Sequence, residues 1–203
     1  MSELRQHWES TYQQKSFEQL GWYQTQPQRS IQMIGPKEEA QPLIDVGAGC
    51  SYLVDHLLAE GFEDVTLLDL SPTALDQVHH RLGAQRAQVK LIAADLLAQP
   101  LEPRYRCWHD RAVLHFLTDP KDQQVYAQQM KGALLKGGRL VIGGFAPQGP
   151  EKCSGLPVVR HSIESLQALW GPGFELVQQA QTLHTTPWGK EQLFLFTQWH
   201  RKG

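Results

Sequence analysis

The sequence has few cysteines and no basic block, and each shortage excludes a class of protein. Its 203 residues include three cysteines, at positions 50, 107 and 153, without a Cys-x-x-Cys pair or a Cys/His cluster of metal-ligand spacing. We therefore expect free thiols, no disulfide framework and no metal site. The formal net charge is −2 and lysine and arginine do not gather in any segment, so we expect no nucleic-acid partner.

Long apolar segments are also absent. The first residues, Met1 to His7, lack the apolar core of a signal peptide, and no run of about 18 apolar residues follows. We expect a cytoplasmic protein without a membrane partner. A hydrophobic content of 41% in 203 residues fits a single domain over residues 1–203, because single domains commonly reach roughly 250 residues.

The most informative stretch runs from Leu43 to Leu53, where a short apolar run precedes a glycine-containing loop and an amphipathic segment. It predicts a strand, a tight turn and a helix. Gly47 and Gly49 allow a sharp turn and the close approach of a ligand, and helix N-termini favour negative charge. Tyr52 stands where a dinucleotide fingerprint needs its third glycine, so the loop favours a nucleoside over a pyrophosphate.

Apolar strand-like runs alternate with helical segments from residue 43 onward, and Ser71-Pro72 and Asp119-Pro120 are typical helix starts. The expected strands are 43–46, 65–69, 88–93, 105–110 and 139–145, followed by a hairpin of 174–184 and 191–199. This alternation predicts an α/β fold with a parallel sheet.

Acids lie near the ends of successive expected strands, at Asp45, Asp69, Asp95 and Asp110. Ligands of open α/β sheets bind outside the carboxyl ends of the strands, so we expect these carboxylates to converge on one site. Each acid taken singly could instead cap a helix or stabilise a turn.

The series Asp45-x-Gly47-x-Gly49, Asp69-Leu70-Ser71 and Ala94-Asp95-Leu96 resembles the cofactor-binding motifs of the class I S-adenosylmethionine-dependent methyltransferases, with Ser51 in place of the usual third glycine. The resemblance implies a seven-stranded Rossmann-like sheet, mostly parallel with a C-terminal antiparallel hairpin and helices on both faces. It implies S-adenosyl-L-methionine as cofactor, with Asp69 on the ribose hydroxyls and Asp95 on the adenine amino group. The full set of cofactor contacts that it implies in the core is Asp45, Gly47, Ala48, Gly49, Asp69, Leu70, Asp95, Leu96 and Asp110.

Aromatic residues punctuate residues 1–35, among them Trp8, Tyr12 and Trp22. Trp8 and Tyr12 are four residues apart and share a helical face. A sulfonium cation favours aromatic faces, and thiopurine-methyltransferase-like enzymes have a similar segment. We expect these three side chains to bind the cofactor as a lid, residues 1–35, over a catalytic core of residues 36–203. The alternative is that they merely cover one end of the sheet.

The methyl acceptor is expected at the end of the fourth strand, where Asp110, Arg111 and His115 supply an acid, a cation and a base for catalysis. The alternative is a structural Asp110–Arg111 ion pair with a solvent-facing histidine. The Asn/Asp-Pro-Pro-Tyr/Phe motif of base-amine and glutamine methyltransferases is absent, which counts against those acceptors.

Two loops, 144–158 and 184–192, resemble a narrower branch that contains the mitochondrial citrate-synthase lysine methyltransferase and bacterial relatives. The resemblance implies methyl transfer to a nucleophilic acceptor that could be a protein lysine. The alternatives are a small-molecule acceptor, whether an amine, an oxygen, a thiol or a thiolate-held metalloid, and a non-catalytic nucleoside-binding domain.

Overall fold

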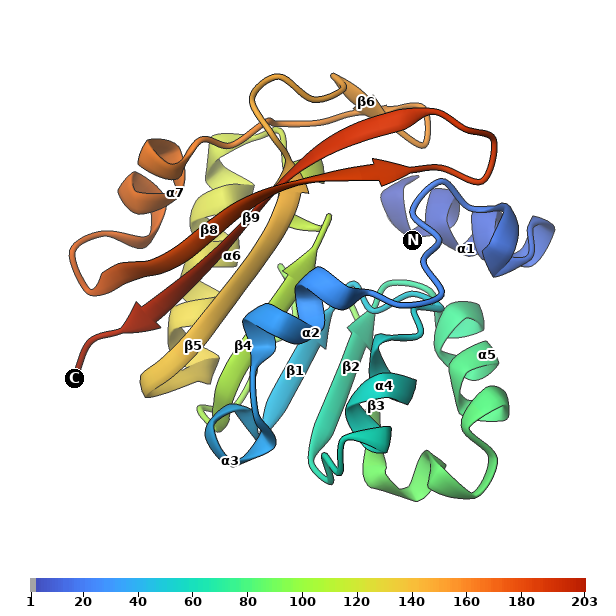
Figure 1. Ribbon diagram of the computed structural model, residues 1–203, viewed down its shortest axis with the longest axis horizontal. Coiled ribbons are helices and arrows are strands. Elements are labelled where there is room, and N and C mark those ends of the chain that lie inside the picture. Colours follow the sequence, from blue (N-terminus) through green and yellow to red (C-terminus); the bar gives the residue numbers. More distant parts are fainter. Residues whose placement is uncertain (1–2) are drawn as a thin grey trace.

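A seven-stranded sheet forms the centre of the computed structural model, which describes residues 3–203 (Figure 1). Its strand order is β3-β2-β1-β4-β5-β9-β8. The strands are β1 Leu43–Val46, β2 Val65–Asp69, β3 Val89–Ala93, β4 Tyr105–Arg111, β5 Leu134–Phe145, β8 Phe174–Thr185 and β9 Glu191–Arg201. β1 to β5 pair in parallel, and β9 runs antiparallel to both β5 and β8. The predicted α/β fold with its closing hairpin is confirmed.

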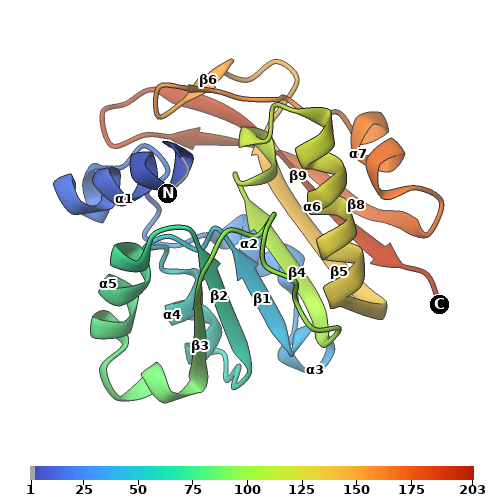
Figure 2. The same cartoon turned by 180° about the vertical axis from the view of Figure 1, so that it is seen from behind.

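Helices cover both faces of the sheet. The helices are α1 Glu3–Gln14, α2 Gln28–Ile34, α3 Lys37–Ala40, α4 Leu53–Ala59, α5 Pro72–Leu82, α6 Pro120–Ala133 and α7 Ile163–Trp170, with short 3-10 turns η1 Phe17–Gln19, η2 Gly83–Gln88 and η3 Leu114–Phe116. Helices α2, α3, α4 and α5 pack on one face of the sheet and share one apolar core with it. Helices α6 and α7 pack on the other face and share a second core. Figure 2 shows the face covered by α6 and α7, and α1 lies beside α5 near the ends of β1 and β2.

The predicted helix starts are confirmed at α5 and α6. The Ser71 hydroxyl accepts the amide of Ala74 at 3.1 Å, and the Asp119 carboxylate accepts the amide of Lys121 at 2.8 Å. Both caps satisfy amide groups that a helix N-terminus leaves unpaired, and the proline that follows each cap lacks such an amide. These caps fix where α5 and α6 leave the carboxyl edge of the sheet.

A short hairpin, β6 Lys152–Cys153 and β7 Leu156–Pro157, occupies a segment that the sequence predicts as loop. Ser154 and Gly155 turn it with φ angles of 50° and 80°. Strands of two residues are too short to show an alternating hydrophobic pattern, which explains the omission.

The cysteines at 50, 107 and 153 are free thiols, and residues 3–203 contain no group of three or more His, Cys, Asp or Glu side chains that could hold a metal ion. Within the same range, no helix combines the length and apolar character that crossing a membrane requires.

Candidate active site

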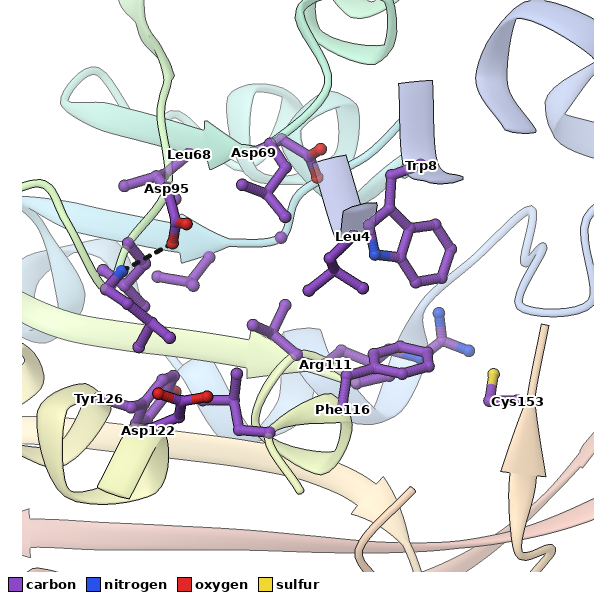
Figure 3. Close-up of a pocket in the computed structure, with 18 of the residues that line it drawn as sticks. Leu4, Trp8, Leu68, Asp69, Asp95, Arg111, Phe116, Asp122, Tyr126 and Cys153 are labelled. Carbon is purple, nitrogen blue, oxygen red and sulfur yellow. Dashed lines mark hydrogen bonds between the residues drawn. The ribbon is translucent and has the colours of Figure 1, made fainter. Parts of the chain in front are cut away.

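A cavity of about 360 Å³ lies at the carboxyl ends of β1 to β4, beneath α1 (Figure 3). This volume is at the small end of the range for ligand pockets, roughly 300–1,000 Å³. Its wall contains predicted cofactor contacts from the lid and from the sheet, together with side chains from the C-terminal third. The predicted contacts on the wall are Trp8, Tyr12, Trp22, Gly47, Asp69, Leu70, Asp95 and Leu96.

Asp69 ends β2 and borders the cavity. Its carboxylate accepts the amides of Gly49 and Ser71, each at 2.8 Å. Burial raises the pKa of Asp69 to about 6 although these hydrogen bonds act to lower it. A carboxylate has about four lone-pair sites, so Asp69 can accept further hydrogen bonds from a ligand.

The glycine loop after β1 is built for close packing. Gly47 and Gly49 have φ angles of 66° and 51°, a region that disfavours side chains. A Cβ at Gly47 would overlap Val113, and one at Gly49 would overlap the Tyr12 hydroxyl. Only Gly47 of the loop reaches the cavity wall, whereas Ala48 packs into the apolar core. The predicted direct contacts of Ala48 and Gly49 are therefore not part of the cavity, and Gly49 acts through its bond to Asp69.

Asp95 lies in the turn after β3 and also borders the cavity. Its carboxylate accepts the amide of Leu97 at 3.0 Å, which orients the turn and brings Leu96 and Leu97 to the wall. This part of the wall therefore places the Asp95 carboxylate beside the apolar side chains of Leu96 and Leu97.

The predicted lid aromatics meet at the cavity. The Trp8 ring lies edge-on to Trp22 at 5.5 Å and to Phe116 at 5.0 Å between centroids, and Tyr12 lies 6.2 Å from Trp22. Phe116 and Phe194 extend this aromatic wall. The sequence did not single out these two phenylalanines, because an aromatic residue in an apolar run predicts core as readily as site.

A carboxylate fastens α1 to the core. Glu9 accepts the Ser71 hydroxyl at 2.6 Å and also the hydroxyl and amide of Thr73, at the N-terminus of α5. Burial acts to raise the pKa of Glu9, but the hydrogen bonds from Ser71, Thr73 and Gln13 outweigh it and the pKa is lowered. The negative charge also suits the helix dipole of α5.

Asp45 corrects the expectation that the strand-end acids converge. Its carboxylate lies 2.6 Å from Nδ1 of His109, whose Nε2 lies 2.9 Å from the Ser30 hydroxyl, and all three side chains are buried away from the cavity. Alternate residues of a strand point to opposite faces. Asp45 therefore ties β1 and β4 to α2, and its cofactor contact stays a prediction that the cavity wall does not support.

Asp110 is buried and does not border the cavity, so the structure does not support its predicted contacts with cofactor and acceptor, which stay predictions. Its carboxylate accepts the amides of Val113 and Leu114 at 2.8 and 3.0 Å and the hydroxyl of Tyr126 at 2.6 Å. Burial raises the pKa of Asp110 to about 6. Because η3 and Tyr126 both border the cavity, Asp110 positions the wall from behind it.

His115 is also placed differently from both alternatives that the sequence allowed. Its ring is buried against Phe116 and Phe145, with centroids 4.3 and 5.1 Å away, outside the cavity. Neither ring nitrogen has a hydrogen-bond partner in residues 3–203, and burial lowers its pKa to about 3. His115 is neither a catalytic base in the cavity nor a solvent-facing side chain.

Arg111 is the one predicted catalytic residue that borders the cavity. Its Nη1 donates to the backbone carbonyl of Trp22 at 2.9 Å, and the guanidinium lies 5.3 Å from the Phe194 ring centroid. Burial lowers its pKa to about 10, which leaves it cationic at neutral pH. Figure 3 shows Arg111 with Phe116 and Cys153 across the cavity from Asp69 and Asp95. The alternative Asp110–Arg111 ion pair is absent from the described residues.

Comparison with known proteins relates part of the chain to a known domain. Residues 43–138 match a family model for a methyltransferase domain. The eEF1A lysine and N-terminal methyltransferase of Mus musculus is 26% identical over 144 residues, which cover 68% of this chain and 20% of the mouse protein. The chain thus spans about a fifth of the length of the curated relatives that it matches.

Solved structures share the fold. One, concerning the conversion of a disulfide bond into a thioacetal group during echinomycin biosynthesis, has a TM-score of 0.78 at 19% identity and covers 98% of this chain and 93% of its own. The 1,6-didemethyltoxoflavin-N1-methyltransferase of Burkholderia thailandensis, with S-adenosylhomocysteine bound, has a TM-score of 0.70 at 19% identity. The match covers 98% of this chain and 88% of the Burkholderia chain. Residues 43–138 thus match a methyltransferase domain, and the chain as a whole has the fold of solved S-adenosylmethionine-dependent methyltransferases.

Proposed function

We propose that the chain transfers the methyl group of S-adenosylmethionine to a small-molecule acceptor in the cavity beneath α1. The cofactor supplies a methyl group activated by a sulfonium leaving group. The residues present fit it: Asp69 can accept ribose hydroxyls, Asp95 can accept the adenine amino group, and Trp8 and Trp22 offer aromatic faces to the sulfonium. The lid and these cofactor contacts remain proposals that binding measurements test.

One observation carries the choice of acceptor, namely the composition of the Arg111 end of the cavity. Arg111, Phe116, Cys153 and Phe194 border it, whereas Asp110 and His115 lie elsewhere. Burial raises the pKa of the Cys153 thiol to about 11, so this thiol is a poor base at neutral pH. A lysine acceptor must lose an ammonium proton before attack, and this end presents a cation to it. An acceptor that is already nucleophilic at neutral pH fits better.

The protein side then contributes position and exclusion of water. In-line attack on a sulfonium methyl needs a nucleophile held at short range and stripped of solvent. Trp8, Trp22 and Phe116 pack edge-on at the cavity wall and would exclude water from a bound acceptor, and Arg111 can orient an acceptor by its charge. A protein lysine is the second candidate acceptor, favoured by the similarity to the eEF1A lysine and N-terminal methyltransferase and by the loops that resemble a lysine-methyltransferase branch.

A labelling experiment separates these functions. The purified chain is incubated with methyl-labelled S-adenosylmethionine and a cell lysate that has been divided by ultrafiltration into small molecules and proteins. We expect label in the small-molecule fraction, and none with Asp69→Ala, which removes a cofactor ligand. Label on protein would favour the lysine acceptor. Cofactor binding without label in either fraction would favour a non-catalytic domain.

A further inference from the structure

Gln192 is a buried glutamine whose side-chain amide has no partner in the part of the chain that the structure describes. It lies in β9, is only 9% exposed and borders the cavity. No hydrogen bond joins its side chain to another group of residues 3–203. Its amide oxygen and nitrogen are nevertheless open, unlike the ring nitrogens of His115, which are sealed and also lack partners in that range. Because burying an unpaired polar group is costly, we expect this amide to meet a partner from outside the chain.

A second glutamine of the same strand is paired within the chain. Gln198 is 7% exposed and lies nearer the end of β9. Its amide oxygen accepts the side-chain amide of Gln178 on the neighbouring strand β8, and it does not border the cavity. Gln192 lies opposite His184 of β8, but Nε2 of that histidine is paired with the backbone carbonyl of Gly21 at 2.7 Å. Within the described residues, one buried glutamine of β9 is therefore satisfied and the other is free at the cavity wall.

Gln192 belongs to the Arg111 end of the cavity. Side chains of alternate residues in a strand point to the same face, so Gln192 and Phe194 are neighbours on one face of β9, about 7 Å apart along the strand. The Phe194 ring centroid lies 5.3 Å from the Arg111 guanidinium. Arg111 lies across the cavity from Asp69 and Asp95 (Figure 3). The amide is thus away from the acids proposed to hold the adenosine and at the end proposed for the acceptor.

Aromatic side chains border the same cavity. They are Trp8, Trp22, Phe116 and Phe194, and the Trp8 ring meets Phe116 and Trp22 edge-on at 5.0 and 5.5 Å between centroids. Aromatic walls favour flat ring ligands, which stack on ring faces or pack against ring edges. A carboxamide both donates and accepts hydrogen bonds, so it matches a ligand that places an N–H group beside an acceptor atom. The wall and the amide together indicate one class of ligand.

We propose that Gln192 recognises the methyl acceptor, and that this acceptor is a flat nitrogen heterocycle with an N–H group beside a carbonyl oxygen, as in a lactam. The proposal rests on the proposed small-molecule function and names its substrate class. The Gln192 amide donates to the carbonyl and accepts the N–H, which fixes the rotation of the ring in its plane and so the ring atom that faces the methyl group. A ligand without this edge leaves the buried amide unpaired and binds more weakly.

Binding measurements test this recognition without relying on turnover. Protein saturated with S-adenosylhomocysteine is titrated in a calorimeter with 2-quinolinone, which has an N–H beside a carbonyl, and with N-methyl-2-quinolinone, which has lost that N–H. Gln192→Met keeps the length of the side chain and removes its donor and acceptor, and Gln192→Leu removes them in a shorter side chain. Gln198→Met is the matched control, because Gln198 is a similarly buried glutamine of β9 that lies away from the cavity.

In wild type and Gln198→Met, we expect 2-quinolinone to bind about tenfold more tightly than its N-methyl derivative. In both Gln192 variants this preference should fall to within about twofold, while the Kd of S-adenosylhomocysteine stays within about twofold of wild type. A preference that survives in the Gln192 variants, or no binding or no preference in wild type, would overturn the proposal. A loss of S-adenosylhomocysteine affinity of about tenfold in these variants would assign the amide to the cofactor and overturn it too.

Failure of the proposed function has a different signature. Label on protein in the lysate experiment would overturn the small-molecule acceptor, whatever the titrations with 2-quinolinone show. Label in the small-molecule fraction without the preference for 2-quinolinone would keep the proposed function and overturn the substrate class.

Discussion

At the scale of single residues, the sequence predicts which strand end an acid lies near but not the face to which it points. Asp69 ends β2 and borders the cavity, as predicted. β1 continues one residue beyond Asp45, and β4 continues one residue beyond Asp110. The register pairs Asp45 with His109 and Asp110 with Val46, so the two acids point to opposite faces of the sheet. Asp45 is bound to His109 and Asp110 to Tyr126 of α6, and neither acid is on the cavity wall, whereas Arg111 is. Strand ends are uncertain by more than one residue from sequence alone, so this distinction could not be predicted.

Replacing His115 tests its removal from the catalytic site. His115→Phe keeps an aromatic ring against Phe116 and Phe145 and removes two buried nitrogens that lack partners in residues 3–203. We expect turnover within about twofold of wild type and equal or greater stability at pH 7. A loss of turnover of roughly 10²-fold would instead restore the catalytic role.

The same variant has a pH signature. The folded-state pKa of His115, about 3, lies below its usual value of ~6.5. As pH falls below that usual value, the unfolded chain gains a proton that the folded chain does not, so wild type loses stability. We expect His115→Phe to lose about 1–2 kcal/mol less than wild type between pH 7 and 5, measured by urea unfolding at both pH values. Parallel losses in the two proteins would contradict the burial of a neutral imidazole.

Asp69 predicts a pH dependence of cofactor affinity. With a pKa raised to about 6, the carboxylate gains its proton as pH falls through 6, and a protonated carboxyl accepts hydrogen bonds from ribose less well. We expect the Kd of S-adenosylhomocysteine in wild type to rise roughly severalfold between pH 7.5 and 5.5. Asp69→Asn should bind about tenfold or more weakly at pH 7.5 and should lack this rise. Matching pH profiles in calorimetry would exclude Asp69 as the titrating ligand.

At the scale of elements, the sequence predicts that the aromatic side chains of α1 share one face of the helix. It does not predict the contact by which Glu9 fastens α1 to α5. Trp8 and Tyr12 share a helical face in the sequence, and both border the cavity. The anchoring contact joins Glu9 to Ser71 and Thr73, which are distant in the sequence. A single acid on a polar helix face gives no signal for such a contact, because most acids of this kind are solvated.

Glu9→Gln tests whether this anchor holds α1 over the site. Glutamine removes the charge at the N-terminus of α5 and directs an NH₂ group towards donors, so α1 should open more often. We expect amide hydrogen exchange of residues 3–14 to accelerate about tenfold, with the core unchanged. Glu3→Gln is the matched control, because Glu3 is an exposed acid of the same helix. Equal exchange in the two variants would show that Glu9 does not anchor the helix.

At the scale of the whole molecule, the alternation of strands and helices predicts the order of the parallel strands. It does not predict which C-terminal residues line the cavity, because the chain brings them there by turning back on itself. β9 returns antiparallel beside β5 and brings Phe194 and Gln192 to the cavity, and the β6–β7 hairpin brings Cys153. From sequence, ligand sites of α/β sheets are located at the ends of parallel strands. None of these three residues ends a parallel strand, so the sequence does not predict that they line the cavity. The cavity therefore joins α1, the carboxyl ends of β1 to β4 and the C-terminal segments.

A ligand that fills this cavity should stabilise all three parts together. S-adenosylhomocysteine at 100 times its Kd should raise the free energy of unfolding by about 2.7 kcal/mol. Hydrogen exchange should slow in residues 3–14 and 152–157 as well as beside Asp69, because Trp8 and Cys153 border the same space. Residues 174–178, at the start of β8 and absent from the cavity wall, provide the internal reference. Slowing confined to the strands β1 to β4 would mean that α1 and the hairpin do not close on the ligand, and the aromatic lid would then be a cover for the sheet alone.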